Sequence, residues 1–143
     1  MHFANNNNNV NLWKPHKCTS MQSMFQSAEE FNGDLSNWFA DQNEWSSTFE
    51  DDGLISFLKA AIKFNGNLFT SIPSTVTSLK HTFVDTHSNE KWGGLTSWDV
   101  SNVKDLSFTF ANCLSLIAFW IAAKAATRSW GDMISLPLLV KLM

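Results

Sequence analysis

Apolar residues recur along this chain in a pattern that repeats itself. The fifteen residues of 21–35 match those of 54–68 at every apolar anchor, and Asn-Gly recurs near the end of both segments. Two weaker copies follow. The residues that close successive units are Val10, Leu35, Leu68, Leu95 and Trp120, at steps of 25, 33, 27 and 25. The chain is therefore a short array of about four units with a base period of 25 residues.

The spacing inside one unit predicts its local structure. Apolar residues of the first complete copy stand at positions 21, 24, 25, 28 and 31. Such steps lie on one stripe of an α-helix, so the pattern predicts a helix over 21–31 that ends near Gly33. Short segments of extended type, such as 35–38 and 95–98, follow the turns. Since stacked units bury what one unit cannot, the sequence predicts an α/β solenoid of about four helix–turn–short-strand units.

The repeat also divides the chain into segments. The expected units are 10–35, 36–68, 69–95 and 96–120. The Asn-rich start, 1–9, is expected to be disordered. Past Trp120 the pattern fails, and 121–143 is expected to form either a divergent cap or a tail.

Several units share a motif that extends beyond apolar spacing. Residues 98–106 (Trp-Asp-Val-Ser-Asn-Val-Lys-Asp-Leu) and 21–36 resemble the repeat W-D-V-S-x-V-x-x-M-x-x-M-F-x-x-A-x-x-F-N-x-D-L-S of the BspA-like leucine-rich-repeat surface proteins. The likeness covers about residues 10–120. It implies a leucine-rich-repeat-like solenoid used for adhesion or protein contacts, with no catalytic residues. The sequence departs from the motif at 14–16 (Lys-Pro-His) and 39–41 (Phe-Ala-Asp), where Asp-Val-Ser is usual, and in an insertion of about eight residues.

The resemblance suggests a location at the cell surface or outside the cell, whereas the residues alone leave the location open. Residues 1–4 (Met-His-Phe-Ala) run directly into asparagines, without the basic and apolar stretches of a secretory signal. The longest apolar run, 114–123, is too short to span a bilayer. We therefore expect no membrane span.

Charge separates one part of the chain from the rest. The net charge of −3 argues against a nucleic-acid surface. Eight acidic residues and no Lys or Arg occupy 29–52, which includes the insertion. Insertions in repeat proteins form loops on one face, often the binding face. We therefore predict a protein-binding site, suited to a partner with a basic surface, at Asp41, Glu44, Trp45, Phe49, Glu50, Asp51 and Asp52. A tolerated surface insertion, costing up to about 1 kcal/mol, is the alternative.

Aromatic residues allow a second interpretation. The chain has 12 Phe and 7 Trp but no Tyr, a skew expected of a fold that reuses one packing position. Trp13, Trp38 and Trp98 each stand three residues after the residue that closes a unit. They form either an exposed ladder for stacking a sugar or peptide, or part of the core.

Groups for catalysis or metal binding are sparse. His81 and His87 are six residues apart and would not share a helical face, so no zinc site is expected. Glu50, Asp51 and Asp52 could at most hold a weak calcium ion, while Cys18 and Cys113 are expected as buried apolar groups. No metal or cofactor is expected.

We expect a non-enzymatic protein-interaction or adhesion-type repeat module. The alternatives are a structural spacer, or a fragment of a larger repeat surface protein, with no specific ligand. The third is a weakly calcium-binding protein or a small metal-dependent enzyme.

Overall fold

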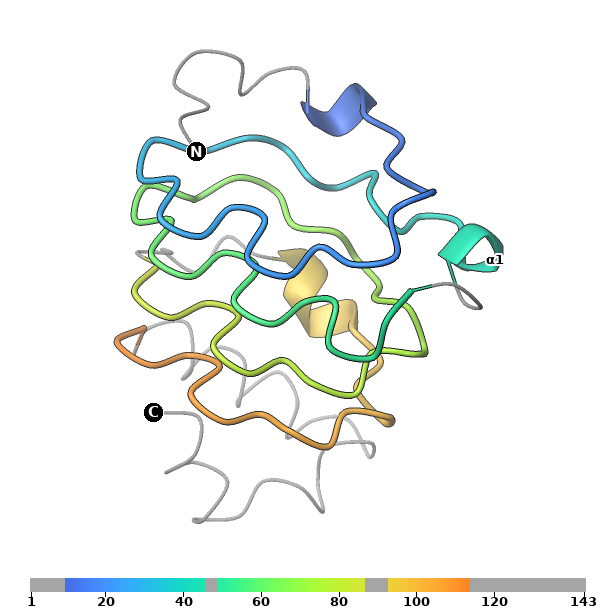
Figure 1. The fold of residues 1–143 in the computed structure, drawn as a ribbon. Helices are drawn as coiled ribbons and strands as arrows, with labels where there is room; N and C mark the ends of the chain where they lie inside the picture. The colour runs from blue at the N-terminus through green and yellow to red at the C-terminus, as the bar shows by residue number, and fades with distance from the viewer. Residues whose placement is uncertain (1–9, 46–48, 87–92, 114–143) are drawn as a thin grey trace.

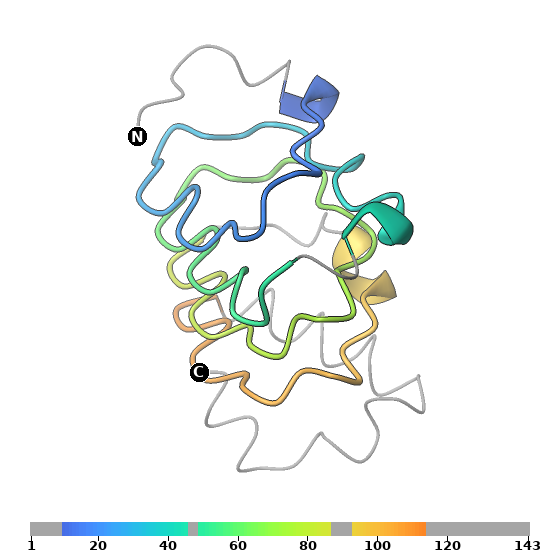
Figure 2. The ribbon, with the colours of Figure 1, turned by 45° about the vertical axis from the view of Figure 1, so that its right-hand side comes forward.

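Turns are the commonest local structure in the described part of this chain. The structure is a computed structural model of the 143-residue protein, and it describes residues 10–45, 49–86 and 93–113. The chain winds in coils that lie one above the other (Figure 1). Each coil has on one face a row of consecutive turns, which we call a rung. The four rungs are 21–28, 54–61, 79–86 and 106–113, and they remain stacked when the view is rotated (Figure 2).

Regular elements are few and short. They are the 3-10 helix η1 (Val10–Leu12), the one-turn α-helix α1 (Gln42–Trp45) and the 3-10 helix η2 (Gly93–Ser97). Among the described residues, one isolated parallel bridge joins Ser78 and Asp105. No helix exceeds five residues within the described ranges, and the same ranges hold no extended strand. The predicted α/β, leucine-rich-repeat-like solenoid of helix–turn–strand units is therefore wrong, and the helix predicted over 21–31 is absent.

Hydrogen bonding explains why turns replace the helix. In rung 1 the N–H groups of Met24, Gln26 and Ala28 each donate to the carbonyl three residues earlier, at 3.1 Å. The N–H groups between them point to the next coil: Phe25 donates to the Phe57 carbonyl at 3.0 Å. In rung 2, every N–H from 55 to 61 has a backbone partner of one of these two kinds. The stack thus satisfies the backbone without helical or strand geometry.

Left-handed backbone allows this alternation. Two positions of each rung have φ between 55° and 60°: Ser23 and Ser27, Ser56 and Ala60, His81 and Asp85, and Phe108 and Asn112. A left-handed L-residue costs about 1–2 kcal/mol and ends a right-handed helix. We attribute the compensation to the bonds between rungs, because each of these residues in the first three rungs donates its N–H to the next coil.

Equivalent side chains meet in the core. Phe25, Leu58, Phe83 and Phe110 are each at most 1% exposed. The rings of Phe83 and Phe110 stack with centroids 5.4 Å apart and planes 8° apart, and those of Phe31 and Phe64 stack at 5.6 Å. These columns bury the apolar positions of neighbouring coils against one another. The predicted disordered start, 1–9, and the predicted cap or tail, 121–143, lie outside the described residues.

Candidate binding site

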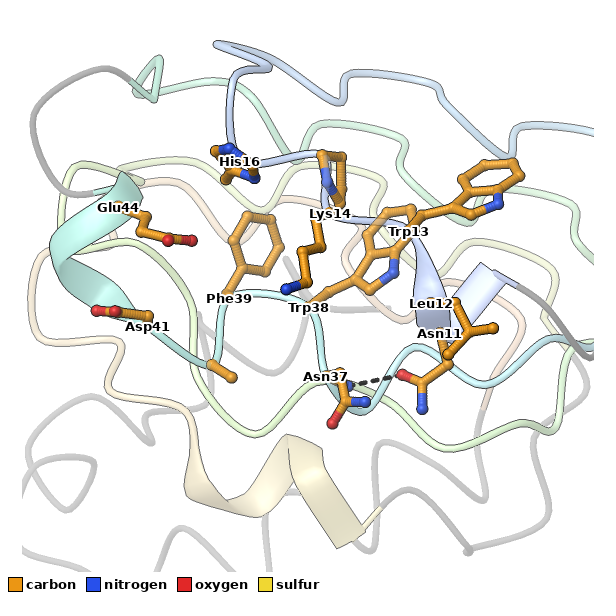
Figure 3. Close-up of a pocket in the computed structure, with 12 residues that line it drawn as sticks. Asn11, Leu12, Trp13, Lys14, His16, Asn37, Trp38, Phe39, Asp41 and Glu44 are labelled. Carbon is orange, nitrogen blue, oxygen red and sulfur yellow. Dashed lines mark hydrogen bonds between the residues drawn. The ribbon is translucent and has the colours of Figure 1, made fainter.

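A pocket of about 410 Å³ lies at the N-terminal end of the stack, between two neighbouring coils. Residues 11–16 form one wall, and 37–41 with Glu44 form the other (Figure 3). The two walls are 25 residues apart in sequence, so they occupy equivalent positions of successive units. The pocket thus follows from the register of the first two coils.

The first wall is fixed to the second by hydrogen bonds. The Trp38 indole N–H donates to the Val10 carbonyl at 3.0 Å, and the Asn37 backbone N–H donates to Asn11 Oδ1 at 2.9 Å. The Asn11 amide in turn donates to Asp34 at 3.3 Å. These bonds hold η1 and the segment after it in place beside residues 37–41.

Tryptophans form an aromatic side of the pocket. The rings of Trp13 and Trp38 stack with centroids 6.4 Å apart and planes 26° apart. Trp38 and Trp98 are 2% exposed, so these two belong to the core, whereas Trp13 is 44% exposed. The two sequence-based interpretations therefore apply to different members of the set: Trp13 presents indole surface, and its equivalents pack inside.

The second wall carries an unusual backbone conformation. Phe39 has φ of 59°, although it is bulky and lies outside the two left-handed rung positions. It is 1% exposed, and its ring packs edge-on against Phe49 and Phe69, with centroids 5.4 Å and 4.9 Å away. The Ser71 hydroxyl donates to its carbonyl at 3.0 Å. Packing and this bond together hold the wall in a conformation that the residue alone would disfavour.

α1 begins at the edge of the pocket. Asp41 Oδ1 accepts from the Asn43 N–H at 3.0 Å, as a capping carboxylate does. The Glu44 carboxylate extends from α1 toward Phe39, and the Lys14 side chain lies between Phe39 and Trp38 (Figure 3). A carboxylate and an ammonium group therefore face the same concavity.

Several polar groups here have unused hydrogen-bonding capacity. The side chains of Lys14, Asn37 and Glu44 have no bonding partner among the residues that the structure describes, and all three are exposed. His16 Nδ1 is buried and lacks a partner in that same part of the chain. A bound ligand could therefore gain hydrogen bonds without displacing protein–protein bonds.

The seven predicted binding residues do not form one patch. Asp41 and Glu44 line the pocket, and the Trp45 side chain lies outside the described part of the structure. Phe49 is 3% exposed and packs in the core, so it presents no contact surface.

Two of the remaining three acids connect coils. The Glu50 N–H donates to the Thr19 carbonyl at 2.7 Å. The Asp51 carbonyl accepts from the N–H groups of Thr77 and Ser78 at 2.8 Å and 3.3 Å, and the Asp52 carbonyl accepts from Ile55. The bonds of Glu50 and Asp51 therefore join neighbouring coils, whereas that of Asp52 closes a turn within its own coil.

Sequence reasoning did not assign Asn11, Trp13, Lys14, His16 and Asn37 to one site. A signal was nevertheless available. The two departures from the repeat motif, 14–16 and 39–41, lie in opposite walls of the pocket. A regular unit has Asp99 at this place, where Oδ1 accepts from the Ser101 N–H at 3.0 Å. Where adjacent copies lose the same motif together, a shared site is indicated.

Among the described residues, two titratable groups outside the pocket have shifted pKa values. Burial, helped by the ammonium groups of Lys59 and Lys80, lowers the pKa of His81, and the Asp105 carboxylate acts in the opposite direction. Burial also raises the pKa of the Cys113 thiol. Both residues lie in rungs 3 and 4, away from the pocket walls.

Metal ligands do not gather in the described residues: no group of three or more His, Cys, Asp or Glu side chains is placed there to hold an ion. Across the same described ranges, no helix is long and apolar enough to cross a bilayer.

Stacked coils of recurring sequence define a repeat protein. The chain belongs to the family described as "Mycoplasma protein of unknown function, DUF285", whose model matches residues 1–54 and 53–129. No curated protein and no solved structure matches the chain.

Proposed function

We propose that the chain is a non-enzymatic, adhesion-type binding module and that the pocket is its binding site. The observation that supports this best is the meeting of two motif departures, 14–16 and 39–41, in one concavity. Concave sites that combine an aromatic surface with a few converging polar groups are the usual form of a ligand site. Here Trp13 supplies the surface, and Lys14 and Glu44 supply polar groups.

The repeat motif supports the same proposal. Its resemblance to BspA-like surface proteins implies adhesion or protein contacts, and we include a surface location and a partner protein in the proposal. The stack holds the backbone of the two pocket walls in register, so the segments that carry the binding groups are positioned before a partner arrives. Such preorganisation reduces the entropy lost on binding.

A structural spacer is the second candidate, and one observation favours it. The carbonyls of Gln22, Met24 and Gln26, on the outer edge of rung 1, accept no hydrogen bond from any described residue. Donors from a further coil would complete them, as rung 1 itself completes rung 2. In that case the pocket would carry no function.

Photo-crosslinking at the pocket rim separates the two candidates. Leu12 is 74% exposed at the pocket, and Ile62 is 36% exposed outside it. Each would be replaced by p-benzoylphenylalanine and irradiated in whole serum, a mixture rich in proteins and glycoproteins. We expect discrete adducts from position 12 that disappear when Glu44→Gln is added, and none from position 62. Equal labelling at both positions, or none at position 12, would favour the spacer.

A further inference from the structure

The chemistry of the pocket narrows the class of ligand. Its volume of about 410 Å³ lies near the lower end of the ~300–1,000 Å³ typical of small-molecule sites. A protein–protein interface, in contrast, buries on the order of 1,200–2,000 Å² of surface. The pocket is therefore sized for a single ring or two, free or carried by a larger partner.

Charges of both signs disfavour a strongly charged ligand. The Lys14 ammonium would repel a cationic group, and the carboxylates of Glu44 and Asp41 would repel an anionic one. A neutral, polar ligand meets neither penalty. A pocket lined by charges of both signs therefore favours a ligand without net charge.

Hydrogen-bonding types point to hydroxyl groups. Lys14 can only donate, the Glu44 carboxylate can only accept, and the Asn37 amide can do both. None of these three side chains has a partner in the described structure. A hydroxyl donates and accepts, so a ligand rich in hydroxyls can satisfy all three, and it can also serve the buried His16 Nδ1 in either tautomer.

An apolar surface lies at the end of the concavity opposite to Glu44 (Figure 3). Trp13 rests on Trp38 on one side and is 44% exposed, and Leu12 next to it is 74% exposed. A pyranose ring matches this arrangement, because one face carries C–H groups that pack on an indole while its edge carries hydroxyls.

We infer that the pocket binds a neutral saccharide of at least two rings, with one ring on Trp13 and the hydroxyls along the saccharide on Lys14, Asn37 and, across the concavity, Glu44 (Figure 3). This inference rests on the proposed function and specifies the ligand of the same site. A glycan attached to a partner protein would place the same chemistry there.

Binding can be tested with the full chain. The protein would first be applied to an array of neutral and charged glycans, and the strongest neutral binder would be titrated while the Trp13 indole N–H resonance is followed by NMR. We expect saturable binding that shifts this resonance. Trp13→Ala and Glu44→Gln should each weaken binding at least tenfold, whereas Glu29→Gln, an exposed acid outside the pocket, should leave it unchanged.

Lys14→Met tests whether removal of the ammonium group weakens or strengthens ligand binding. Because Lys14 is exposed, this variant should fold as the parent does. Loss of a hydroxyl contact predicts weaker saccharide binding by about fivefold. If the ligand were instead cationic, removal of the ammonium group would strengthen binding, and a hexa-arginine peptide serves as that probe.

Three results would overturn the inference: no neutral glycan binds, Trp13→Ala binds as well as the parent, or only charged ligands bind. Its failure is distinguishable from failure of the proposed function. Adducts from position 12 without any saccharide binding would remove the saccharide and keep the binding module, whereas absence of both would remove the two together.

Discussion

Single residues set the path of the backbone. Ala60 and Ala61 are neighbours of the same type in rung 2, yet only Ala60 has a left-handed φ, of 58°. Ala61 is fully buried, and its N–H donates to the Leu58 carbonyl at 3.0 Å. The pair therefore gives a matched comparison between a residue that bears the conformational cost and one that does not.

Glycine should have opposite effects at these two positions. Ala60→Gly removes the left-handed penalty and should raise the free energy of unfolding by up to about 1 kcal/mol, after the entropic cost of glycine is subtracted. Ala61→Gly adds the entropic cost of glycine but removes no left-handed penalty, so it should lower the free energy of unfolding by about 1 kcal/mol or more. Urea unfolding measures both. Changes of the same sign would contradict the left-handed assignment.

Thiol chemistry reports on rung 4 at the same scale. Cys113 is 5% exposed, and its Sγ lies 2.9 Å from the Phe83 carbonyl oxygen. Burial raises the pKa of this thiol, which lowers the fraction of reactive thiolate near neutral pH. We expect Cys113 to react with a thiol reagent only on unfolding and half-buried Cys18 to react faster. Mass spectrometry of the labelled chain would locate each adduct, and fast labelling of native Cys113 would contradict this burial.

At the scale of the element, apolar spacing identified buried positions but not backbone conformation. Met21, Phe25, Ala28 and Phe31 are each at most 2% exposed. A helix repeats every 3.6 residues, and the turns here repeat every four, so both bring nearly the same residues to one side. The predicted helix failed because apolar spacing does not distinguish the two. Asp, Asn and His tolerate left-handed backbone, so these residue types in rungs 3 and 4 are compatible with turns in place of a helix. Ala60 and Phe108 are also left-handed, but their residue types do not indicate it.

Adjacent coils approach closely at Gly33 and Gly66, so one added methyl group there should strongly affect stability. A Cβ at Gly66 would collide with the carbonyl oxygen of Gly33 in the coil before it. Gly66→Ala should therefore lower the free energy of unfolding by about 1–3 kcal/mol, as overpacking does. Asn67→Ala alters an adjacent exposed side chain and should change it by less than about 0.5 kcal/mol. Comparable effects in thermal or urea unfolding would show that these coils do not approach so closely.

For the whole molecule, the recurring pattern identified which positions are equivalent, whereas the site depends on how those positions are arranged in space. Asp41 and Glu44 were predicted as binding residues, but the pocket also needs Trp13 and Lys14 from the preceding coil. Local sequence did not reveal that Phe49 turns inward, because an aromatic beside acids suits either a loop or a core. Phe49 is buried because its ring packs against that of Phe39, which lies near the opposite end of the inserted segment.

Scalar couplings across hydrogen bonds test the stack most directly, because they identify the donor and acceptor of each bond in solution. In isotope-labelled protein, the account predicts a coupling from the Leu58 nitrogen to the Thr82 carbonyl carbon and from Phe83 to Thr109, whose N–H···O distances are both 2.9 Å. Couplings from Leu58 and Phe83 to the carbonyls four residues earlier would instead show helices, and would contradict the stack of turns on which the pocket depends.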